Sequence, residues 1–384
     1  MVPSMRRSIA LLLLALVACE LLAEAQAQLT HSAVNHPRPP MLHNKKGLKT
    51  ASKKSSLDPS NFLVVLIAAV VLLYGANRAL RPPFMDMSAS SQEAMAYEEA
   101  AEAGEMQLHT TFMFVITASC SLVLIFYFMS AMSVLISVLF SFISSLALGA
   151  LVYPYVDRYT DNRYSREMDV PYLGPIPVLV FILAPPCIVC VGTWLLTKSW
   201  ILNNILAISL IIFFLTSVRL SSLKVASSLL TLAFFYDIFW VFISSSIFGK
   251  NVMVTVATGL NVPIKILVPL MMSHGKKMQF TLIGLGDIVL PGLLICFCLR
   301  LDDAKGISKR SGYFAVVMVG YCIGLTICEI VVGTFHWAQP AMIYLVPGTL
   351  IPFVWKAHSR GEISDVWEGL KSHHRLDDSG MSHP

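Results

Sequence analysis

The chain has few charged residues. Lys, Arg, Asp and Glu make up 13% of its 384 residues, whereas 56% are hydrophobic and the mean hydropathy is +0.69. Several apolar runs exceed the roughly 18 residues that indicate a membrane span, so the composition excludes an ordinary soluble domain. The net charge of +5 comes from basic residues scattered over loops and tails, which argues against a nucleic-acid surface.

The patterns typical of disulfide frameworks, metal sites and serine-type triads are also absent. Of the eight cysteines, Cys19 falls in the leader and the others fall in predicted spans, so neither a disulfide framework nor a zinc site is expected. Cys187 and Cys190 have redox or metal spacing but lack a partner pair. No histidine lies within an apolar span, which argues against a serine-type triad. We expect no metal and no cofactor.

The apolar runs predict an all-α polytopic membrane protein with nine transmembrane helices. The second and third runs are separated by only a few small residues. Pro347 and Pro352 predict that the last helix is broken or tilted. The predicted spans are Phe62–Leu80, Phe112–Met132, Val134–Tyr153, Leu173–Leu196, Ile201–Arg219, Val225–Ser245, Phe280–Arg300, Tyr313–Thr334 and Pro340–Trp355.

Basic residues outside the leader predict the orientation. With a lumenal N-terminus and a cytosolic C-terminus, fifteen Lys and Arg fall on the cytosolic side and eleven on the lumenal side, in mild agreement with the positive-inside rule. An uncleaved signal anchor remains the alternative to a cleaved leader. The expected organisation is a cleaved signal peptide (1–27), a disordered lumenal tail (28–60), helices one to five (61–224), helices six to nine (225–355) and a cytosolic tail (356–384).

Two of the apolar segments carry one aspartate each in their interior, Asp237 and Asp287. A carboxyl at such a depth costs at least about 2.5 kcal/mol and usually marks a functional site. If both segments are helices joined on one side, Asp237 lies eight residues from Ser245 and Asp287 seven residues from Phe280. At about 1.5 Å per residue the depths are roughly 12 and 10.5 Å, so the two aspartates can face each other.

Two carboxyls held close together at low dielectric cannot easily both ionise. One then keeps its proton while the other acts as a base, as in aspartic proteases. The charged member would draw a proton from water, and the neutral member would donate a hydrogen bond to the scissile carbonyl. The pair titrates as a unit, so the proton belongs to neither residue alone.

Three motifs carry a family resemblance: Tyr236-Asp237, Gly284-Leu285-Gly286-Asp287 and Gln339-Pro340-Ala341-Met342. In this order they resemble the signature of the presenilin-type intramembrane aspartyl proteases. The runs Asn251–Ala257 and Pro263–Lys265 are most similar to the signal peptide peptidase branch. The similarity covers about Asn61 to Trp355. Met342 stands where the family has leucine, a residue of similar size.

The resemblance implies an intramembrane endopeptidase of the endoplasmic-reticulum membrane with Asp237 and Asp287 as catalytic residues. It implies remnant signal peptides and other type II single-span segments as substrates, with membrane lipid around them. It also allows a homo-oligomer or membrane quality-control partners. The residues that it assigns to substrate positioning are Tyr236, Gly284, Gly286, Gln339, Pro340, Ala341 and Met342.

The connection Ile247–Gln279 is too polar to be a tenth span. Its β-branched run Val252–Val256 suggests a strand that could pair with an unwound substrate. Such pairing matters because helical peptide bonds are shielded from a protease.

Alternative interpretations remain open for each feature. The aspartates could be structural carboxyls, Tyr236 could support Asp237 or only fill space, the glycines could serve close packing, and Gln339–Ala341 could be a helix start. Glu329, another acid within a span, is interpreted mainly as structural, with its side chain reaching the interface. A transporter or channel would use the paired carboxyls for ions, with Gly174–Pro177 and Pro185-Pro186 breaking a helix. A scaffold would hold substrates without cutting them.

Overall fold

The computed structural model describes residues 58–80, 105–160, 167–170, 174–249, 252, 263–270, 280–335 and 339–368. The predicted leader, most of the lumenal tail and the chain beyond residue 368 lie outside these ranges. Within them the chain forms nine long helices. Seven of the described helices are long and apolar enough to cross a membrane, so the predicted class is confirmed while the count of nine spans is not.

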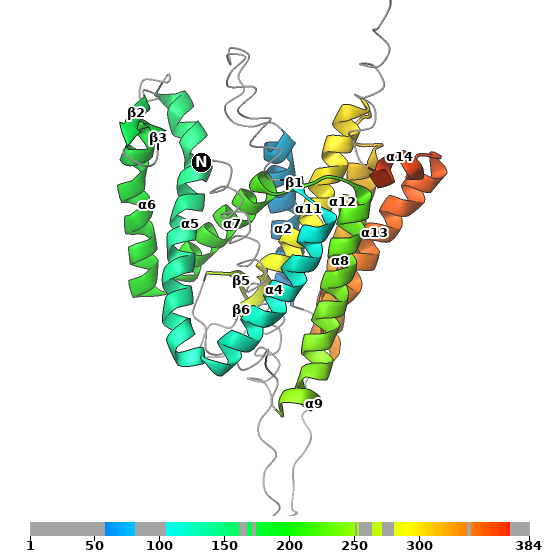
Figure 1. Ribbon diagram of the computed structural model, residues 1–384, viewed down its shortest axis with the longest axis horizontal. Helices are drawn as coiled ribbons and strands as arrows, with labels where there is room; N and C mark the ends of the chain where they lie inside the picture. Colours follow the sequence, from blue (N-terminus) through cyan, green and yellow to red (C-terminus); the bar gives the residue numbers. More distant parts are fainter. Residues whose placement is uncertain are drawn as a thin grey trace, which may run out of the picture.

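The long helices form one bundle (Figure 1). The helices α5 and α6 stand at one side, the helices α8, α12 and α13 at the other, and α2 and α11 lie between them. The nine helices are α2 (Pro59–Leu80), α4 (Leu108–Tyr127), α5 (Met129–Tyr159), α6 (Val178–Thr197), α7 (Trp200–Ser217), α8 (Leu223–Ile238), α11 (Leu285–Ala304), α12 (Tyr313–Phe335) and α13 (Met342–Ser359).

Short elements connect the helices. A π-helical turn η1 (Phe239–Ile243) and the short α9 (Ser244–Phe248) continue α8, and α14 (Ile363–Glu368) follows α13. Three two-stranded sheets join segments that are close in space. They are β1 (Glu105–Met106) parallel to β4 (Arg219–Leu220), β2 (Glu167–Val170) antiparallel to β3 (Gly174–Pro177), and β5 (Lys265–Pro269) antiparallel to β6 (Phe280–Gly284).

The helix α11 is the centre of the bundle. All but three of its residues are buried, and it packs against α2, α7, α8, α12 and α13. Four charged residues occur within it, Asp287, Arg300, Asp302 and Asp303. These charges separate α11 from the seven strongly apolar helices, which are also much less buried.

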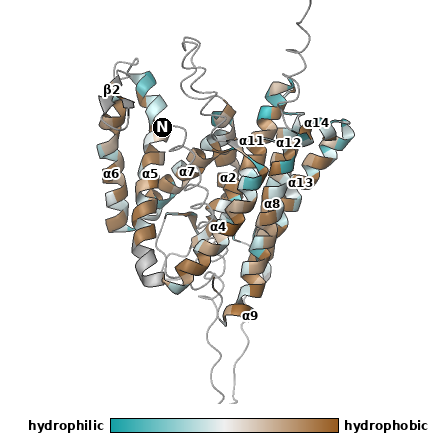
Figure 2. Ribbon diagram, viewed as in Figure 1, coloured by the Kyte–Doolittle hydropathy of each residue, from teal (hydrophilic) through white to brown (hydrophobic). Residues whose placement is uncertain are grey.

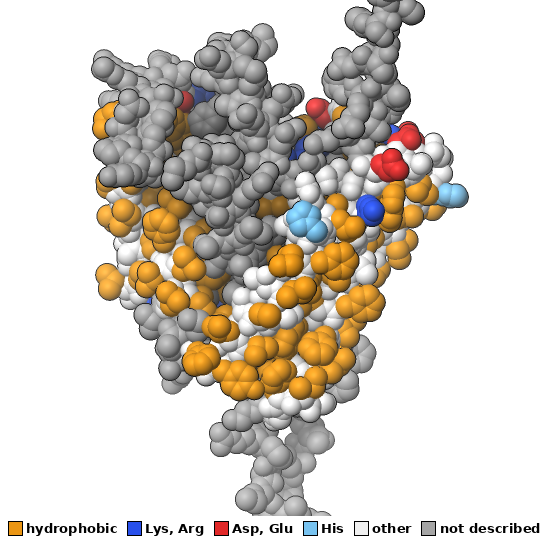
Figure 3. Space-filling model, viewed as in Figure 1, with side chains coloured by type: hydrophobic (Ala, Val, Ile, Leu, Met, Phe, Trp, Pro, Cys, Tyr) orange, Lys and Arg blue, Asp and Glu red, His pale blue; other side chains and the backbone are white. Residues whose placement is uncertain are grey.

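The outer surface of the bundle is apolar. Large side chains such as Leu66, Ile188 and Ile351 expose 59%, 62% and 65% of their surface. Hydrophobic residues dominate the middle of the helices (Figure 2), and charged side chains gather toward the end that holds α14 (Figure 3). A surface of this kind is the one a bilayer stabilises, because exposed apolar area of this extent is unfavourable in water.

The predicted helix Phe280–Arg300 is wrong at its start. Residues Phe280–Gly284 form β6 and the helix begins at Leu285. The side chains of β6 alternate in burial, as a strand requires, and each residue pairs with one of Lys265–Pro269. The run is therefore apolar because it lies inside the protein, not because it begins a span. Of the strand expected at Val252–Val256, only Val252 is described, in a helical conformation, and the rest lies outside the described residues.

The prolines do not break their helices. Both Pro185 and Pro186 lie inside a continuous α6, although a transporter interpretation required a break there. Residues Gly174–Pro177, invoked with them, form the strand β3. The helix α13 also runs unbroken through Pro347 and Pro352 to Ser359. Of the two alternatives for the last helix, a break is therefore wrong, and a tilt stays a prediction. Neighbouring helices re-satisfy the backbone groups that a proline frees.

The helices α12 and α13 approach each other closely. Glycines allow this approach: a Cβ on Gly320 would overlap the carbonyl oxygen of Gly348, and one on Gly324 would lie 2.7 Å from the carbonyl oxygen of Tyr344. Pro352 has no N–H to donate to Gly348, so this carbonyl lacks its helical donor at the point of contact. Small residues thus fix α13 against α12.

Candidate active site

Asp237 lies in the last turn of α8 and is 8% exposed. The N-cap of the helix is Ser222, whose Oγ accepts a hydrogen bond from the N–H of Val225 at 3.3 Å. Directly after Ile238 the helix widens into the π-helical turn η1. Such turns occur frequently at functional sites, because the extra residue re-aims the side chains around it.

Asp287 lies in the first turn of α11 and is 6% exposed. The helix starts directly from β6, with the extended residue Gly284 as its N-cap, and Gly286 is buried in the same turn. Pro291 stands four residues after Asp287 and has no N–H, so the carbonyl of Asp287 lacks its usual helical donor. A carboxyl in this position faces the positive end of the helix dipole.

The two aspartates come together. At about 1.5 Å per residue, α8 rises roughly 21 Å from Leu223 to Asp237, and α11 rises roughly 26 Å between Asp287 and Ala304. These are comparable depths from the same end of the bundle. The carboxyl of Asp237 is within electrostatic reach of Asp287. The two carboxyls are therefore neighbours at similar depth, and their catalytic pairing stays a prediction. The depth measured from Phe280 was wrong, because a strand precedes α11.

The start of α13 contacts Asp237. The backbone N–H of Met342 donates to Oδ2 of Asp237 at 3.4 Å. Pro340, Ala341 and Met342 are buried, and the side chain of Gln339 accepts a hydrogen bond from the hydroxyl of Tyr344 one turn further on. The Gln339–Met342 segment is therefore both the start of a helix and a neighbour of the aspartate, so the two interpretations of it are compatible.

Tyr236 is buried beside Asp237, with 6% of its surface exposed. Its ring packs against that of Trp240, with the centroids 6.1 Å apart and the planes 55° to each other. The indole of Trp240 stacks in turn on Phe248 at 5.9 Å. These aromatic contacts span η1 and join it to the end of α8, so Tyr236 contributes to the packing around the aspartate.

Sequence reasoning underestimated Glu329. It is 8% exposed within α12 and lies within electrostatic reach of Asp287, so its side chain does not reach the interface as expected. Cys328 beside it is also buried and is within electrostatic reach of both aspartates. The sequence does contain an indication that Glu329 is buried. It follows Tyr321 and Leu325 at intervals of four residues, which places all three on one face of the helix.

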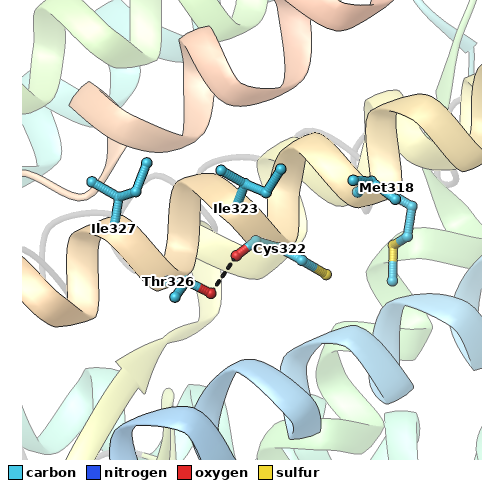
Figure 4. A pocket seen from close by; sticks show the side chains of 6 residues that line it. Met318, Cys322, Ile323, Thr326 and Ile327 are labelled. Carbon is cyan, nitrogen blue, oxygen red and sulfur yellow. Dashed lines mark hydrogen bonds between the residues drawn. The ribbon is translucent and has the colours of Figure 1, made fainter. Parts of the chain in front are cut away.

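Two surface hollows lie away from the aspartates. One, of about 340 Å³, is formed by Met318, Cys322, Thr326 and neighbouring residues, all on α12 (Figure 4). The other, of about 750 Å³, lies between α5 and α6 and is lined by residues such as Leu146 and Ile188. Both are mainly apolar and neither includes Asp237 or Asp287, so the candidate site is the contact between α8, α11 and α13.

Comparison with known proteins places the whole site inside one family. A family model described as Signal peptide peptidase matches residues 98–373, which include both aspartates and the start of α13. The match begins just before α4 and ends beyond α14.

Relatives in plants match over similar lengths. Signal peptide peptidase-like 3 of Oryza sativa subsp. japonica is 36% identical over 281 residues, which are 70% of this chain and 53% of the relative. The chain thus spans about half the length of that relative. Signal peptide peptidase-like 1 of the same organism is 31% identical, over 82% of this chain and 94% of the relative. Signal peptide peptidase-like 1 of Arabidopsis thaliana is 30% identical, over 82% and 93%. On these matches the chain belongs to the signal peptide peptidase family.

Proposed function

We propose that this protein is an intramembrane aspartyl endopeptidase with Asp237 and Asp287 as its catalytic residues. The observation that carries the proposal is the pair of buried carboxyls from α8 and α11 within electrostatic reach of each other. A backbone N–H from α13 on Asp237 supports it further. Membership in the signal peptide peptidase family agrees with this chemistry.

The proposed reaction uses one proton shared between the two carboxyls. The ionised carboxyl takes a proton from water as the water oxygen attacks the scissile carbonyl carbon. The protonated carboxyl donates a hydrogen bond to the carbonyl oxygen, whose charge develops as the tetrahedral diol forms. A proton then passes to the amide nitrogen, the C–N bond breaks, and an acid and an amine leave. The pair ends the cycle with one proton, as it began.

Membrane-spanning peptides are the proposed substrates, above all remnant signal peptides and other type II single-span segments. The proposed location is the endoplasmic-reticulum membrane, with the N-terminus lumenal and the C-terminus cytosolic. The apolar surface of the bundle and the distribution of basic residues support this placement. In this arrangement the region 225–355 supplies the catalytic helices, and 61–224 supplies the helices that support them.

The strand β6 is the proposed pairing edge for an unwound substrate, in place of Val252–Val256. The outer edge of β5 is already occupied by α7, because the side chain of Asn204 both donates to the carbonyl of Leu267 at 2.7 Å and accepts from its N–H at 2.8 Å. On the opposite side, the carbonyl of Ile264 accepts from the N–H of Leu285 at 3.1 Å. In an antiparallel ladder the backbone groups of successive residues point to alternate sides. Because Leu282 lies opposite Leu267, its N–H and C=O point away from β5, toward a substrate strand next to Asp287.

The test is purified protein in detergent with a fluorescently labelled signal peptide. Asp237→Ala and Asp287→Ala should each abolish cleavage. Asp303→Asn is the matched control, since Asp303 is an exposed carboxyl of the same helix, and should retain it. Cleavage that persists in either aspartate variant would refute the catalytic assignment. Ion flux in reconstituted vesicles, or peptide capture without cleavage, would instead favour a transporter or a scaffold.

A further inference from the structure

Glu329 occupies a place in α12 that otherwise holds apolar residues. The buried positions of this helix recur at intervals of three and four residues, and Tyr321 and Leu325 precede Glu329 on the same ridge. The parallel ridge of Gly320, Gly324 and Cys328 turns toward α13. A carboxyl among such residues costs on the order of 2.5 kcal/mol in a membrane, so a function is the expected reason for its presence.

The position of Glu329 matches that of the aspartate pair. At about 1.5 Å per residue, α12 rises roughly 24 Å from Tyr313 to Glu329, against roughly 26 Å between Asp287 and Ala304 in α11. The two helices are joined by a short connection and pack against each other, so both carboxyls are at nearly the same depth. Electrostatic interaction between Glu329 and Asp287 agrees with this geometry.

Glu329 has no partner among the residues that the structure describes. No hydrogen bond or ion pair is formed by its carboxyl within those ranges, although more than nine-tenths of the residue is buried. The described titratable groups that interact with it are Asp287 of α11 and the neighbouring Cys328, and no lysine, arginine or histidine of α2 or α13 is among them. Cys328 is the adjacent thiol, and Tyr344 of α13 interacts with that thiol.

This arrangement favours a large cation over a metal ion. Within the described ranges, no three acidic, cysteine or histidine side chains are grouped closely enough to hold a metal. An ammonium or guanidinium group needs only one carboxylate and carries its own stem through the apolar surroundings. A membrane-embedded substrate is the source of such a group that reaches this depth.

We propose that Glu329 is a specificity-determining residue that binds a lysine or arginine side chain of the substrate near the scissile bond. The proposal rests on the proposed function, because it places this side chain beside the catalytic pair. A basic residue in the membrane is costly until it finds a carboxylate, so the ion pair with Glu329 favours substrates that carry one.

The experiment compares two series of single-span peptides in detergent. In one series a lysine is moved through about one helical turn on either side of the cleaved bond. In the other, norleucine takes the same positions and keeps the stem without the amine. The measured quantity is the ratio of kcat/KM for the lysine peptide to that for its norleucine partner, determined for the unaltered protein, for Glu329→Gln and for Glu362→Gln as a carboxyl control outside the bundle core.

The unaltered protein should prefer lysine at one position by about tenfold or more, the effect of one charge-assisted hydrogen bond. Glu329→Gln should bring that ratio close to one, and Glu362→Gln should keep it. The ratio of the Kd values of the same two peptides, measured by fluorescence anisotropy, gives the lysine preference independently of turnover. A variant that cleaves neither peptide can therefore still be compared. An equal ratio in the unaltered protein and in Glu329→Gln would overturn the inference, as would the lack of any lysine preference. Failure to cleave any peptide, with lysine preference kept in binding, would instead count against the proposed function alone.

Discussion

The backbone N–H of Met342 donates to Oδ2 of Asp237 at 3.4 Å, so the first residue of α13 contacts a carboxyl of α8. The contact joins two segments separated by 105 positions in the chain. It uses a free N–H of a helix start, which no residue within α13 can satisfy. The start of α13 therefore acts on the aspartate through its backbone, whatever side chain occupies position 342.

Met342→Pro tests this backbone contact. Proline is tolerated at the first position of a helix and lacks the N–H that contacts Asp237. Because a proline disfavours the helical backbone of Ala341 before it, an unchanged Tm is required to show that α13 still forms. We expect kcat/KM to fall about tenfold, because a hydrogen bond to a carboxylate is typically worth more than one between neutral groups. Met342→Leu keeps the N–H and a similar volume, and should lose much less. Equal losses in both variants would show that the side chain, not the backbone, matters.

Leu282→Pro tests the pairing edge of β6. The N–H of Leu282 points away from β5, so proline should remove a donor for the substrate without breaking the β5–β6 ladder. We expect a several-fold loss of kcat/KM, the effect of one neutral hydrogen bond. Thr281→Pro is the matched comparison: its N–H faces β5, so it should also lower the Tm. A Leu282→Pro variant with unchanged kinetics would exclude substrate pairing along β6.

Gly320→Ala tests the close approach of α12 and α13. A methyl group there would overlap the backbone oxygen of Gly348, and a backbone cannot move aside as a side chain can. We expect a lower Tm, since overpacking typically costs about 1–3 kcal/mol. Gly192→Ala in α6 is the control, because nothing lies within 4 Å of its added methyl group. It should leave the Tm equal or higher. The hypothesis fails if both variants unfold at the same temperature.

Glu362 joins three elements at the end of the bundle. Its Oε2 accepts from Nζ of Lys305 at 2.6 Å and from the hydroxyl of Tyr313 at 2.7 Å, which connects the chain beyond α13 to α11 and α12. Burial raises the pKa of Glu362, but the hydrogen bonds from Lys305 and Tyr313 outweigh it and hold that pKa below its usual value.

A depressed pKa in the folded state means that Glu362 stabilises the protein above its unfolded pKa of about 4.3. This stabilisation is lost as the pH falls through the folded pKa. The Tm of the unaltered protein should therefore decrease more between pH 6 and strongly acidic solution than that of Glu362→Gln. Since the pair is partly exposed, the difference should stay within about 1 kcal/mol and shrink in high salt. Parallel Tm curves for the two proteins would contradict this role.

The long apolar helices could be predicted from sequence, because each is long enough to cross a bilayer and faces lipid on one side. The start of α11 could not, since Phe280–Gly284 is equally apolar as a buried strand and as a helix. In its partner strand Lys265–Pro269, Lys265 is the only polar side chain, so the sequence shows hardly any alternation of polar and apolar residues. The asparagines of α7 that bind this strand are distant in sequence. Prolines were poor guides to helix breaks, because tertiary packing decides whether a freed carbonyl finds compensation.

For the site, the motifs predicted which residues lie together. Which atoms contact one another, and at what depth, depended on the fold. Asp237 and Asp287 came together although the counted depth for Asp287 started from the wrong residue. The contact of Met342 is made by its backbone, which no side-chain pattern can reveal. The position of Glu329 near Asp287 could not be predicted, because the sequence shows the buried face of α12 but not that this face packs against α11.

The central place of α11 has a consequence for how the protein is made. With four charged residues, α11 is costly to place in a bilayer alone, and neighbours such as α2, α7 and α12 surround it in the bundle. Asp287 follows Asp237 in the chain, and its helix packs against helices from both halves of the chain. A chain that ends before α11 lacks Asp287 and therefore cannot assemble the proposed catalytic pair.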